Sequence, residues 1–372
     1  MNPVFPMGIA TGAAFCDRYQ ERAELKNNIL HNRHTVLLAP RRYGKTSLAS
    51  EVVRESGLLC AEIDFLLSAN AKAVEARILD KVGFVLHQLL PKKKSPKEKI
   101  LQLFHKLKPE LTISALGQKV VLHAPNPTDR EITISDVLLN LDHAAQSLKK
   151  RVVFFMDEFQ QLGELKDNHS IEASIRHAVE RSQNVSYIFS GSNRHMLTQM
   201  FSDKNRPFYR LCTTINLNRI QKPDHIKFIQ KQSKHKWKKE LPDETISEII
   251  CLSECHPYYV NLICKYFWDN NLFPSKKQIE KMWHEYIESQ KSVISYDLVS
   301  LSNNQKILLF ELAKYPTQQP FSQEYLHRTQ LSIASQKEAA KKLLLGDYIY
   351  KDDKGITRVL DPAIRSFVDI YC

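Results

Sequence analysis

Residues 35–53 have the sequence Thr35-Val-Leu-Leu-Ala-Pro-Arg-Arg-Tyr-Gly-Lys-Thr-Ser-Leu-Ala-Ser-Glu-Val-Val53. A short run of apolar and β-branched residues ends at Pro40, and a tight polar turn follows. Leu48 and Val52 then recur at helical spacing. The segment is therefore predicted to form a strand, a loop and a helix. Because the amide groups that open a helix lack intrahelical partners, the loop is predicted to bind an anion.

Residues 39–46 match the pattern of a phosphate-binding loop (P-loop), except that Ala39 stands where the pattern has its first glycine. Alanine fits that position only if its φ angle is negative. Lys45 is expected to reach the β- and γ-phosphates of a nucleotide, and the Thr46 hydroxyl to ligate Mg²⁺. The alternative is a chance Gly-Lys-Thr in an ordinary loop, which the predicted strand and helix on either side disfavour. The candidate nucleotide-binding residues of the loop are Pro40, Arg41, Arg42, Tyr43, Gly44, Lys45, Thr46 and Ser47.

Length and composition limit the kind of protein. The chain has 372 residues, enough for two or three domains, and a formal net charge of +12. Its hydrophobic content of 43% is typical of a soluble protein, and it has neither a signal peptide nor an apolar run of membrane-spanning length. Seven cysteines without a Cys-x-x-Cys pair favour reduced thiols, so we expect a cytoplasmic protein. Cys251, Cys255 and His256 raise the question of zinc, but no fourth ligand is evident and buried thiols are favoured.

A second motif lies downstream, in residues 151–162. The continuous apolar run from Val152 to Met156 predicts a strand buried on both faces. Asp157 and Glu158 follow at its carboxyl end, where ligands bind in open α/β sheets. Asp157 is the candidate to hold Mg²⁺ through a water molecule, and Glu158 is the candidate base that polarises the attacking water. Two acids that cap a helix after a strand are the alternative, which the earlier P-loop disfavours.

The next predicted strand, residues 185–190, ends in Gly191-Ser192-Asn193. Asn193 is a candidate to contact the γ-phosphate or to position the attacking water. It is equally a candidate to do no more than cap the helix that follows. Both interpretations remain open.

The remaining elements define the expected architecture. Strands at residues 58–65 and 212–217 complete a parallel sheet of five strands, with a long helix at residues 69–90 and a hairpin at residues 111–115 and 119–123. Pro91 to Pro96 is predicted to be a surface loop, and Ser135 to cap a helix that ends at Leu148.

From residue 221 onward the pattern is helical. After residue 300 the spacing is that of a winged helix, with helices at residues 303–314, 322–328 and 332–345 and a hairpin at residues 348–350 and 358–360. The predicted domains are a P-loop core at residues 1–220, a helical lid at residues 221–299 and a winged helix at residues 300–372.

Basic residues concentrate between Lys222 and Lys239, in a stretch where residues 222–240 carry seven lysines against two acids. Such a stretch can bind polyanions, although a solvated helix face is the commoner explanation. The predicted winged helix carries many acids, so we favour contact with a protein over contact with DNA there.

The motifs Pro40-Arg-Arg-x-Gly-Lys-Thr-Ser-Leu48, Met156-Asp-Glu-Phe-Gln160 and His256-Pro-Tyr-Tyr259 together resemble the archaeal-type ATPase family, a relative of the STAND and AAA+ ATPases. The resemblance extends from Phe15 to the predicted winged helix. It implies an α/β P-loop NTPase fold with a parallel five-stranded core, a helical lid and a C-terminal winged helix. It also implies the use of ATP and Mg²⁺, and it places Asn193 in the position of a sensor residue.

The same resemblance concerns two further segments. The segment with Phe15 and Arg18 borders the adenine in that family, although a capping helix without ligand contact explains it equally well. His256 and Pro257 belong to a lid turn that lies against the nucleotide in the family. Here Cys255 replaces the glycine of that turn.

Arg210 immediately precedes the predicted fifth strand. In AAA+ rings this location faces the nucleotide of the neighbouring subunit, where an arginine can neutralise transition-state charge. In a STAND-like monomer the same arginine acts in cis, and an ion pair with a surface acid is a third alternative. We favour the action in trans over the action in cis, which implies self-association with ATP.

The leading hypothesis is that Mg²⁺-ATP binding and hydrolysis drive a conformational switch or the remodelling of an unknown protein partner. The first alternative is a nucleic-acid-binding ATPase, a DNA loader or transposition-type helper that uses the Lys222 to Lys239 stretch or the winged helix. The second is a scaffold that binds ATP without hydrolysing it.

Overall fold

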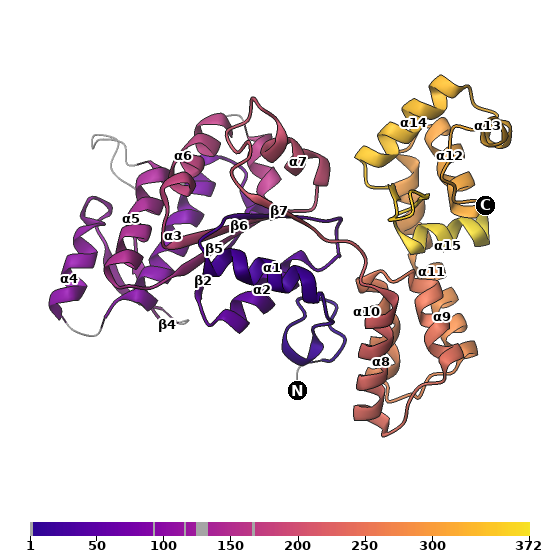
Figure 1. Cartoon of the computed structure of the whole chain (residues 1–372), viewed down its shortest axis with the longest axis horizontal. Coiled ribbons are helices and arrows are strands. Elements are labelled where there is room, and N and C mark those ends of the chain that lie inside the picture. Colours follow the sequence, from indigo (N-terminus) through magenta and orange to yellow (C-terminus); the bar gives the residue numbers. More distant parts are fainter. Residues whose placement is uncertain (1–2, 92–93, 115–116, 124–132, 166–167) are drawn as a thin grey trace. The chain divides into compact units, whose positions relative to one another are not determined.

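The computed structural model describes residues 3–91, 94–114, 117–123, 133–165 and 168–372. The chain divides into two compact units (Figure 1). The α/β unit is Ile9–Asn218, and the helical unit is Arg219–Cys372 together with the chain up to Gly8. Each unit has its own cluster of buried apolar side chains.

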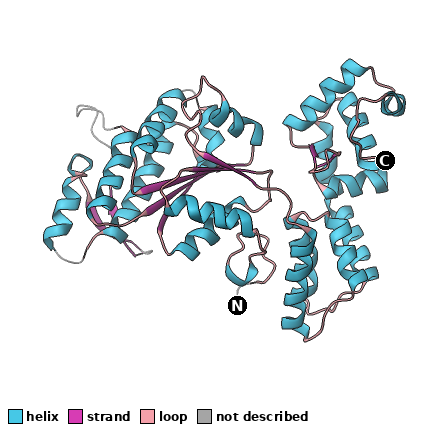
Figure 2. Cartoon of the chain, in the orientation of Figure 1, coloured by secondary structure: helices cyan, strands magenta, loops and turns pink. Residues whose placement is uncertain are grey.

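A parallel sheet of five strands forms the centre of the α/β unit (Figure 2). Its strand order is β2-β5-β6-β1-β7, and every neighbouring pair is parallel, as the sequence predicts. The strands are β1 (Thr35–Leu38), β2 (Leu59–Asp64), β5 (Val152–Asp157), β6 (Val185–Gly191) and β7 (Thr213–Asn216). Since β6 lies between β1 and β5, its carboxyl end adjoins both the P-loop and the acid pair.

Helices cover both faces of the sheet, which explains why β5 and β6 are almost entirely buried and mostly apolar. In Figure 1, α1 (Tyr19–Leu30) and α2 (Lys45–Ser56) lie on one face, and α5 (Ile134–Ser147), α6 (Asn168–Arg181) and α7 (Arg194–Ser202) lie on the other. On the second face, Phe159 packs edge-on against Phe189 and Phe208, with ring centroids 4.7 and 5.2 Å apart. The contact between Phe159 and Phe208 therefore holds the segment after β5 next to the segment after α7.

Two local predictions were wrong. The helix α4 (Lys94–Gln102) begins inside the predicted loop at residues 91–96, of which residues 92–93 lie outside the described part. Pro96 falls in the first turn of α4, where a missing amide hydrogen costs nothing. The helix α5 is capped by Thr133 rather than Ser135, because Thr133 and Asp136 form a reciprocal capping box. The predicted hairpin is present as β3 (Glu110–Ser114) and β4 (Gly117–Val121), and α3 (Ala71–Leu89) packs against it.

The helical unit contains the helices and the hairpin that the sequence predicts after residue 221, followed by one more helix. They are α8 (Lys222–Trp237), α9 (Asp243–Ser253), α10 (Pro257–Asp269), α11 (Lys276–Val299), α12 (Asn303–Lys314), α13 (Gln323–Thr329), α14 (Ile333–Leu345), β8 (Ile349–Lys351), β9 (Thr357–Val359) and α15 (Pro362–Tyr371). Phe5 is buried in this unit, with its ring 4.8 Å from that of Trp268. Glu254 pairs with both Arg219 and Arg365. The division into lid and winged helix at residue 300 remains a prediction.

Two further findings concern membrane-spanning helices and cysteines. Among the described helices, none is long and apolar enough to cross a membrane. All seven cysteines, each of which the structure describes, are free thiols.

Candidate active site

The P-loop connects β1 to α2. Gly44 caps the helix with a φ angle of +87°, a left-handed conformation that glycine adopts without strain. Ala39 is not among the described residues with a positive φ angle, so alanine meets the condition set for that position. Lys45 and Thr46 form the first turn of α2, where backbone amides point into the loop. The loop therefore has the backbone geometry of an anion site.

The side chain of Lys45 is only 7% exposed and turns back over the loop. Its Nζ donates to the carbonyl oxygens of Ala39 and Pro40, each at 3.2 Å. The ammonium group of Lys45 therefore lies at the loop, where the sequence predicts that phosphates bind.

The N-terminal segment forms hydrogen bonds with residues of the P-loop. Arg18 is buried, and its guanidinium donates to the carbonyl oxygens of Tyr43 at 2.7 Å and of Asn218 at 3.0 Å. The Ser47 hydroxyl accepts a hydrogen bond from the Ala10 amide at 3.0 Å. Burial lowers the pKa of Arg18 from its ordinary value, and Glu21 partly offsets that effect. Arg18 thus contacts the P-loop backbone directly.

Other predicted nucleotide contacts lie at the surface of the same unit. Phe15 is half-buried, with its ring 5.4 Å from the Arg22 guanidinium. Arg41 and Arg42 are exposed, and Arg42 has a φ angle of +63°. Their contacts with a nucleotide remain predictions.

Asp157 ends β5 and contacts the P-loop helix. Its Oδ2 accepts a hydrogen bond from Thr46 Oγ1 at 2.7 Å, across the position of β6. Its Oδ1 accepts hydrogen bonds from the Glu158 amide at 2.9 Å and from the Ser190 hydroxyl. A hydroxyl and a carboxylate offer the hard oxygen atoms that Mg²⁺ prefers, and the hydrogen bond shows that the two side chains converge on one place. Thr46 and Asp157 therefore fit Mg²⁺.

Glu158 has a left-handed backbone, with a φ angle of +51°. Its Oε2 accepts three hydrogen bonds, from the Ser192 amide at 3.2 Å, the Ser192 hydroxyl at 2.8 Å and Gln160 Nε2 at 2.5 Å. Burial raises the pKa of Glu158, but these hydrogen bonds and the charge of Lys45 outweigh it and hold the pKa below its ordinary value. The carboxyl is therefore ionised at neutral pH, as a proton acceptor must be.

The sequence interpretation missed Ser190, Ser192 and Gln160. Asn193, the residue it chose at the end of β6, is exposed, and its side-chain oxygen accepts a hydrogen bond from the Met196 amide at 3.0 Å, so it caps α7. Ser190 and Ser192 instead reach the acid pair. The available signal was the spacing of two serines that flank Gly191 at a strand end next to β5. The sensor role of Asn193 stays a prediction.

Arg210 lies in the connection between α7 and β7. It is exposed, it has a φ angle of +54°, and its guanidinium lies 5.1 Å from the Tyr209 ring. Its amide donates to the Phe201 carbonyl oxygen at 3.2 Å. Within the described part of the chain, the side chain makes no ion pair, which leaves it accessible to another molecule.

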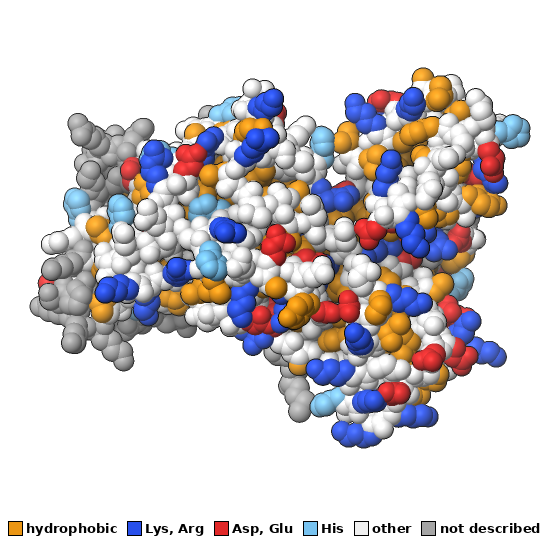
Figure 3. Space-filling view, viewed as in Figure 1, with side chains coloured by type: hydrophobic (Ala, Val, Ile, Leu, Met, Phe, Trp, Pro, Cys, Tyr) orange, Lys and Arg blue, Asp and Glu red, His pale blue; other side chains and the backbone are white. Residues whose placement is uncertain are grey.

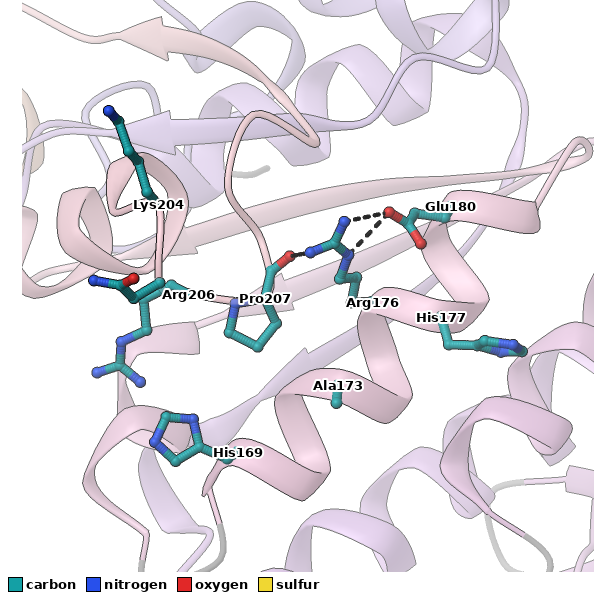
Figure 4. Close-up of a pocket in the computed structure, with 9 residues that line it drawn as sticks. His169, Ala173, Arg176, His177, Glu180, Lys204, Arg206 and Pro207 are labelled. Carbon is teal, nitrogen blue, oxygen red and sulfur yellow. Dashed lines mark hydrogen bonds and ion pairs between the residues drawn. The ribbon is translucent and has the colours of Figure 1, made fainter.

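A pocket of about 500 Å³ lies beside this connection, between α6 and residues 204–207 (Figure 4). Its arginines are engaged within the α/β unit. Arg176 pairs with Glu180 at 2.6 Å and donates to the Pro207 carbonyl oxygen, and Arg206 pairs with the buried Glu172 at 3.2 Å. These contacts hold the connection that leads to Arg210 against α6. No P-loop residue lines the pocket.

His256 and Pro257 belong to the helical unit. His256 caps α10 through Nδ1, which accepts from the Tyr258 amide at 3.2 Å, and Pro257 is the first residue of the helix. Cys255 has a φ angle of +60°, so its turn keeps the left-handed conformation that the replaced glycine would favour. Burial raises the pKa of Cys255. The described residues contain no group of three or more His, Cys, Asp or Glu side chains that could hold a metal ion.

No protein-family model and no curated protein sequence matches the chain. Among solved structures, it is similar to a Walker-type ATPase of Pyrococcus abyssi, with 18% identity over 98% of this chain and 99% of that one and a TM-score of 0.68. It is also similar to the ORC2 protein of Aeropyrum pernix in its ADPNP–ADP complexes, with 12% identity over 99% and 96% of the two chains and a TM-score of 0.56. These likenesses show the fold, an α/β unit with a parallel five-stranded sheet followed by helices.

Proposed function

We propose that the protein binds ATP with Mg²⁺ in the α/β unit and hydrolyses the γ-phosphate. The observation that carries this proposal is the 2.7 Å contact between Thr46 and Asp157 beside Lys45. It joins the two motifs that the sequence keeps far apart. A strand end with two acids serves many purposes, but a P-loop hydroxyl in contact with the first acid suits a nucleotide-bound cation.

Each part of the site then has one task. The loop amides and Lys45 bind the phosphates, and Thr46 and Asp157 hold Mg²⁺. When bound, the cation neutralises charge that develops on the β- and γ-phosphate oxygens. Glu158 orients the attacking water and accepts its proton at Oε1, because Oε2 already accepts three hydrogen bonds. Phe15 and Arg18 lie on the adenine side, and Asn193 acts as the sensor residue.

The nucleotide acts on the rest of the chain through the helical unit. In this proposal His256 and Pro257 contact the bound nucleotide, and the helical unit changes its position relative to the α/β unit as ATP is hydrolysed. The protein belongs to the archaeal-type ATPase family, works in the cytoplasm and remodels a protein partner. Phosphate release from ATP, measured with Mg²⁺ and with EDTA, tests the enzymatic part.

A nucleic-acid partner is the second candidate, because lysines of the Lys222 to Lys239 stretch are exposed along and beyond α8. Several have other engagements: Lys234 pairs with Glu240 at 2.6 Å, and Lys239 lies 4.9 Å from the Phe273 ring. On the face shown in Figure 3, basic side chains are interspersed with acidic ones. Both observations favour a solvated helix face.

We therefore expect that changing Lys231, Lys234, Lys236, Lys238 and Lys239 to Gln has little effect on DNA binding measured by fluorescence anisotropy with ATP present. Exposed Lys277 and Lys281, changed to Gln, are the matched control. The opposite result would be a loss of DNA affinity confined to the first set, with the slope of log K against log[salt] smaller in magnitude by about 4 to 5. That result would establish the nucleic-acid candidate instead.

Arg210 is proposed to act on the nucleotide of a second copy of this chain. Arg210→Ala and Glu158→Gln are each expected to be inactive alone. A mixture of the two is expected to recover ATP turnover, because mixed assemblies contain sites with both an intact base and an intact arginine. Specific activity of the parent should also rise with protein concentration. If mixing restores nothing and specific activity is constant, Arg210 does not act in trans.

A further inference from the structure

Gln160 is buried at a cost that packing does not explain. It lies in the short helix η4 (Phe159–Glu164) directly after the acid pair, and it is only 2% exposed. Its Nε2 donates to Glu158, whereas its Oε1 is buried and has no hydrogen-bond partner among the described residues. A buried acceptor without a partner destabilises the folded state. Methionine would fill a similar volume without that penalty, so the amide needs another explanation.

The orientation of the amide follows from Glu158. If the amide were reversed, its oxygen would face a carboxylate oxygen at 2.5 Å, and two acceptors repel each other. The donated hydrogen bond therefore fixes the amide and leaves Oε1 unpartnered. The same contact joins Gln160 to Ser192, which donates to the same carboxylate oxygen through its amide and its hydroxyl.

Gly191 provides the space for this arrangement. A Cβ atom added there would lie 1.8 Å from Gln160 Oε1 and 2.9 Å from its Cδ, whereas the next contact, with Leu197, would be an ordinary 3.5 Å. The backbone of Gly191 does not have a positive φ angle. The position therefore requires glycine for space rather than for conformation.

We propose that Gln160 is a positioning residue for the hydrolysis of ATP: with Ser192 it fixes Glu158 through Oε2 and so presents Oε1 to the attacking water. The inference rests on the proposed function, in which Glu158 is the base. Within the described residues, no donor contacts Oε1, so that oxygen keeps its lone pairs for the water. A carboxylate held through one oxygen loses little freedom on reaching the reactive geometry.

Gln160→Met tests the proposal, and Gln161→Met is its matched control. Gln161 is the neighbouring residue of η4, is half-buried, and makes no side-chain hydrogen bond to a described residue. We expect Gln160→Met to lower kcat about 10- to 100-fold with unchanged KM and unchanged ATP affinity. Its melting temperature should equal or exceed that of the parent, because the unpartnered acceptor is removed. Gln161→Met should keep the parental kcat.

Gly191→Ala provides an independent variant, because it displaces the Gln160 side chain without replacing any polar residue of the site. It should lower kcat to a similar extent and also lower the melting temperature. The double variant Gly191→Ala/Gln160→Ala should have the kcat of Gln160→Ala alone, since the added methyl group then has room. A parental kcat in both Gln160→Met and Gly191→Ala would overturn the positioning role while Glu158→Gln remains inactive. If Glu158→Gln is itself fully active, the base assignment fails and the positioning role fails with it.

Discussion

Lys45→Ala is expected to weaken ATP binding at least about 100-fold, equivalent to about 2.8 kcal/mol. The lysine Nζ lies over the P-loop and donates to two loop carbonyl oxygens. Phosphate oxygens are negatively charged acceptors, so exchanging the two neutral carbonyl oxygens for them adds the attraction between opposite charges to each hydrogen bond. Without the lysine, the phosphates lose the cation that the loop places beside them. Isothermal titration with ATP and Mg²⁺ measures the change.

The matched control for this experiment is Lys150→Ala, which removes an exposed lysine of the same unit. The control should bind ATP as the parent does. Circular dichroism should show that Lys45→Ala is folded, because only the side chain above the loop is lost. Parental affinity in Lys45→Ala would mean that residues 39–46 do not bind the nucleotide phosphates.

The sheet was predictable from the sequence because its signals are local. The strand β5 is a continuous apolar run up to Asp157, and β6 is a fully buried, mostly apolar strand, which are the patterns that a parallel sheet covered on both faces favours. The P-loop was predictable for the same reason, since its strand, turn and helix are contiguous. The start of α4 was missed because Pro96 lies in the first helical turn, where proline is tolerated.

The detailed site was less predictable because it depends on pairing between distant segments. That Thr46 contacts Asp157 requires the loop after β1 and the end of β5 to meet across β6. The sequence interpretation did not single out Ser192, whose amide and hydroxyl donate to the Glu158 carboxylate. The close packing of Gln160 against Gly191 cannot be predicted from the hydrophobic periodicity of either segment. Such contacts follow from the strand order rather than from the sequence of any one segment.

Glu158→Gln is expected to retain ATP and to lose turnover by about 10²- to 10⁴-fold. The substituted amide has nearly the same shape as the carboxylate. Its oxygen can take the place of Oε2 and accept the hydrogen bonds from Ser192 and Gln160, so the loop and the metal ligands are unaffected. Its NH₂ group then occupies the place of Oε1 and cannot accept a proton from water. The variant therefore separates the binding of ATP from its hydrolysis.

The release of inorganic phosphate from ATP by the parent and by Glu158→Gln, with Mg²⁺ and with EDTA, tests the proposed ATPase activity most directly. We predict release by the parent that requires Mg²⁺, and release by Glu158→Gln that is lower by about 10²- to 10⁴-fold although both proteins bind ATP equally. Release by Glu158→Gln at the parental rate would show that Glu158 is not the base. A parent that binds ATP and Mg²⁺ but releases no phosphate above the protein-free blank would contradict hydrolysis and identify a scaffold that binds ATP as a structural ligand.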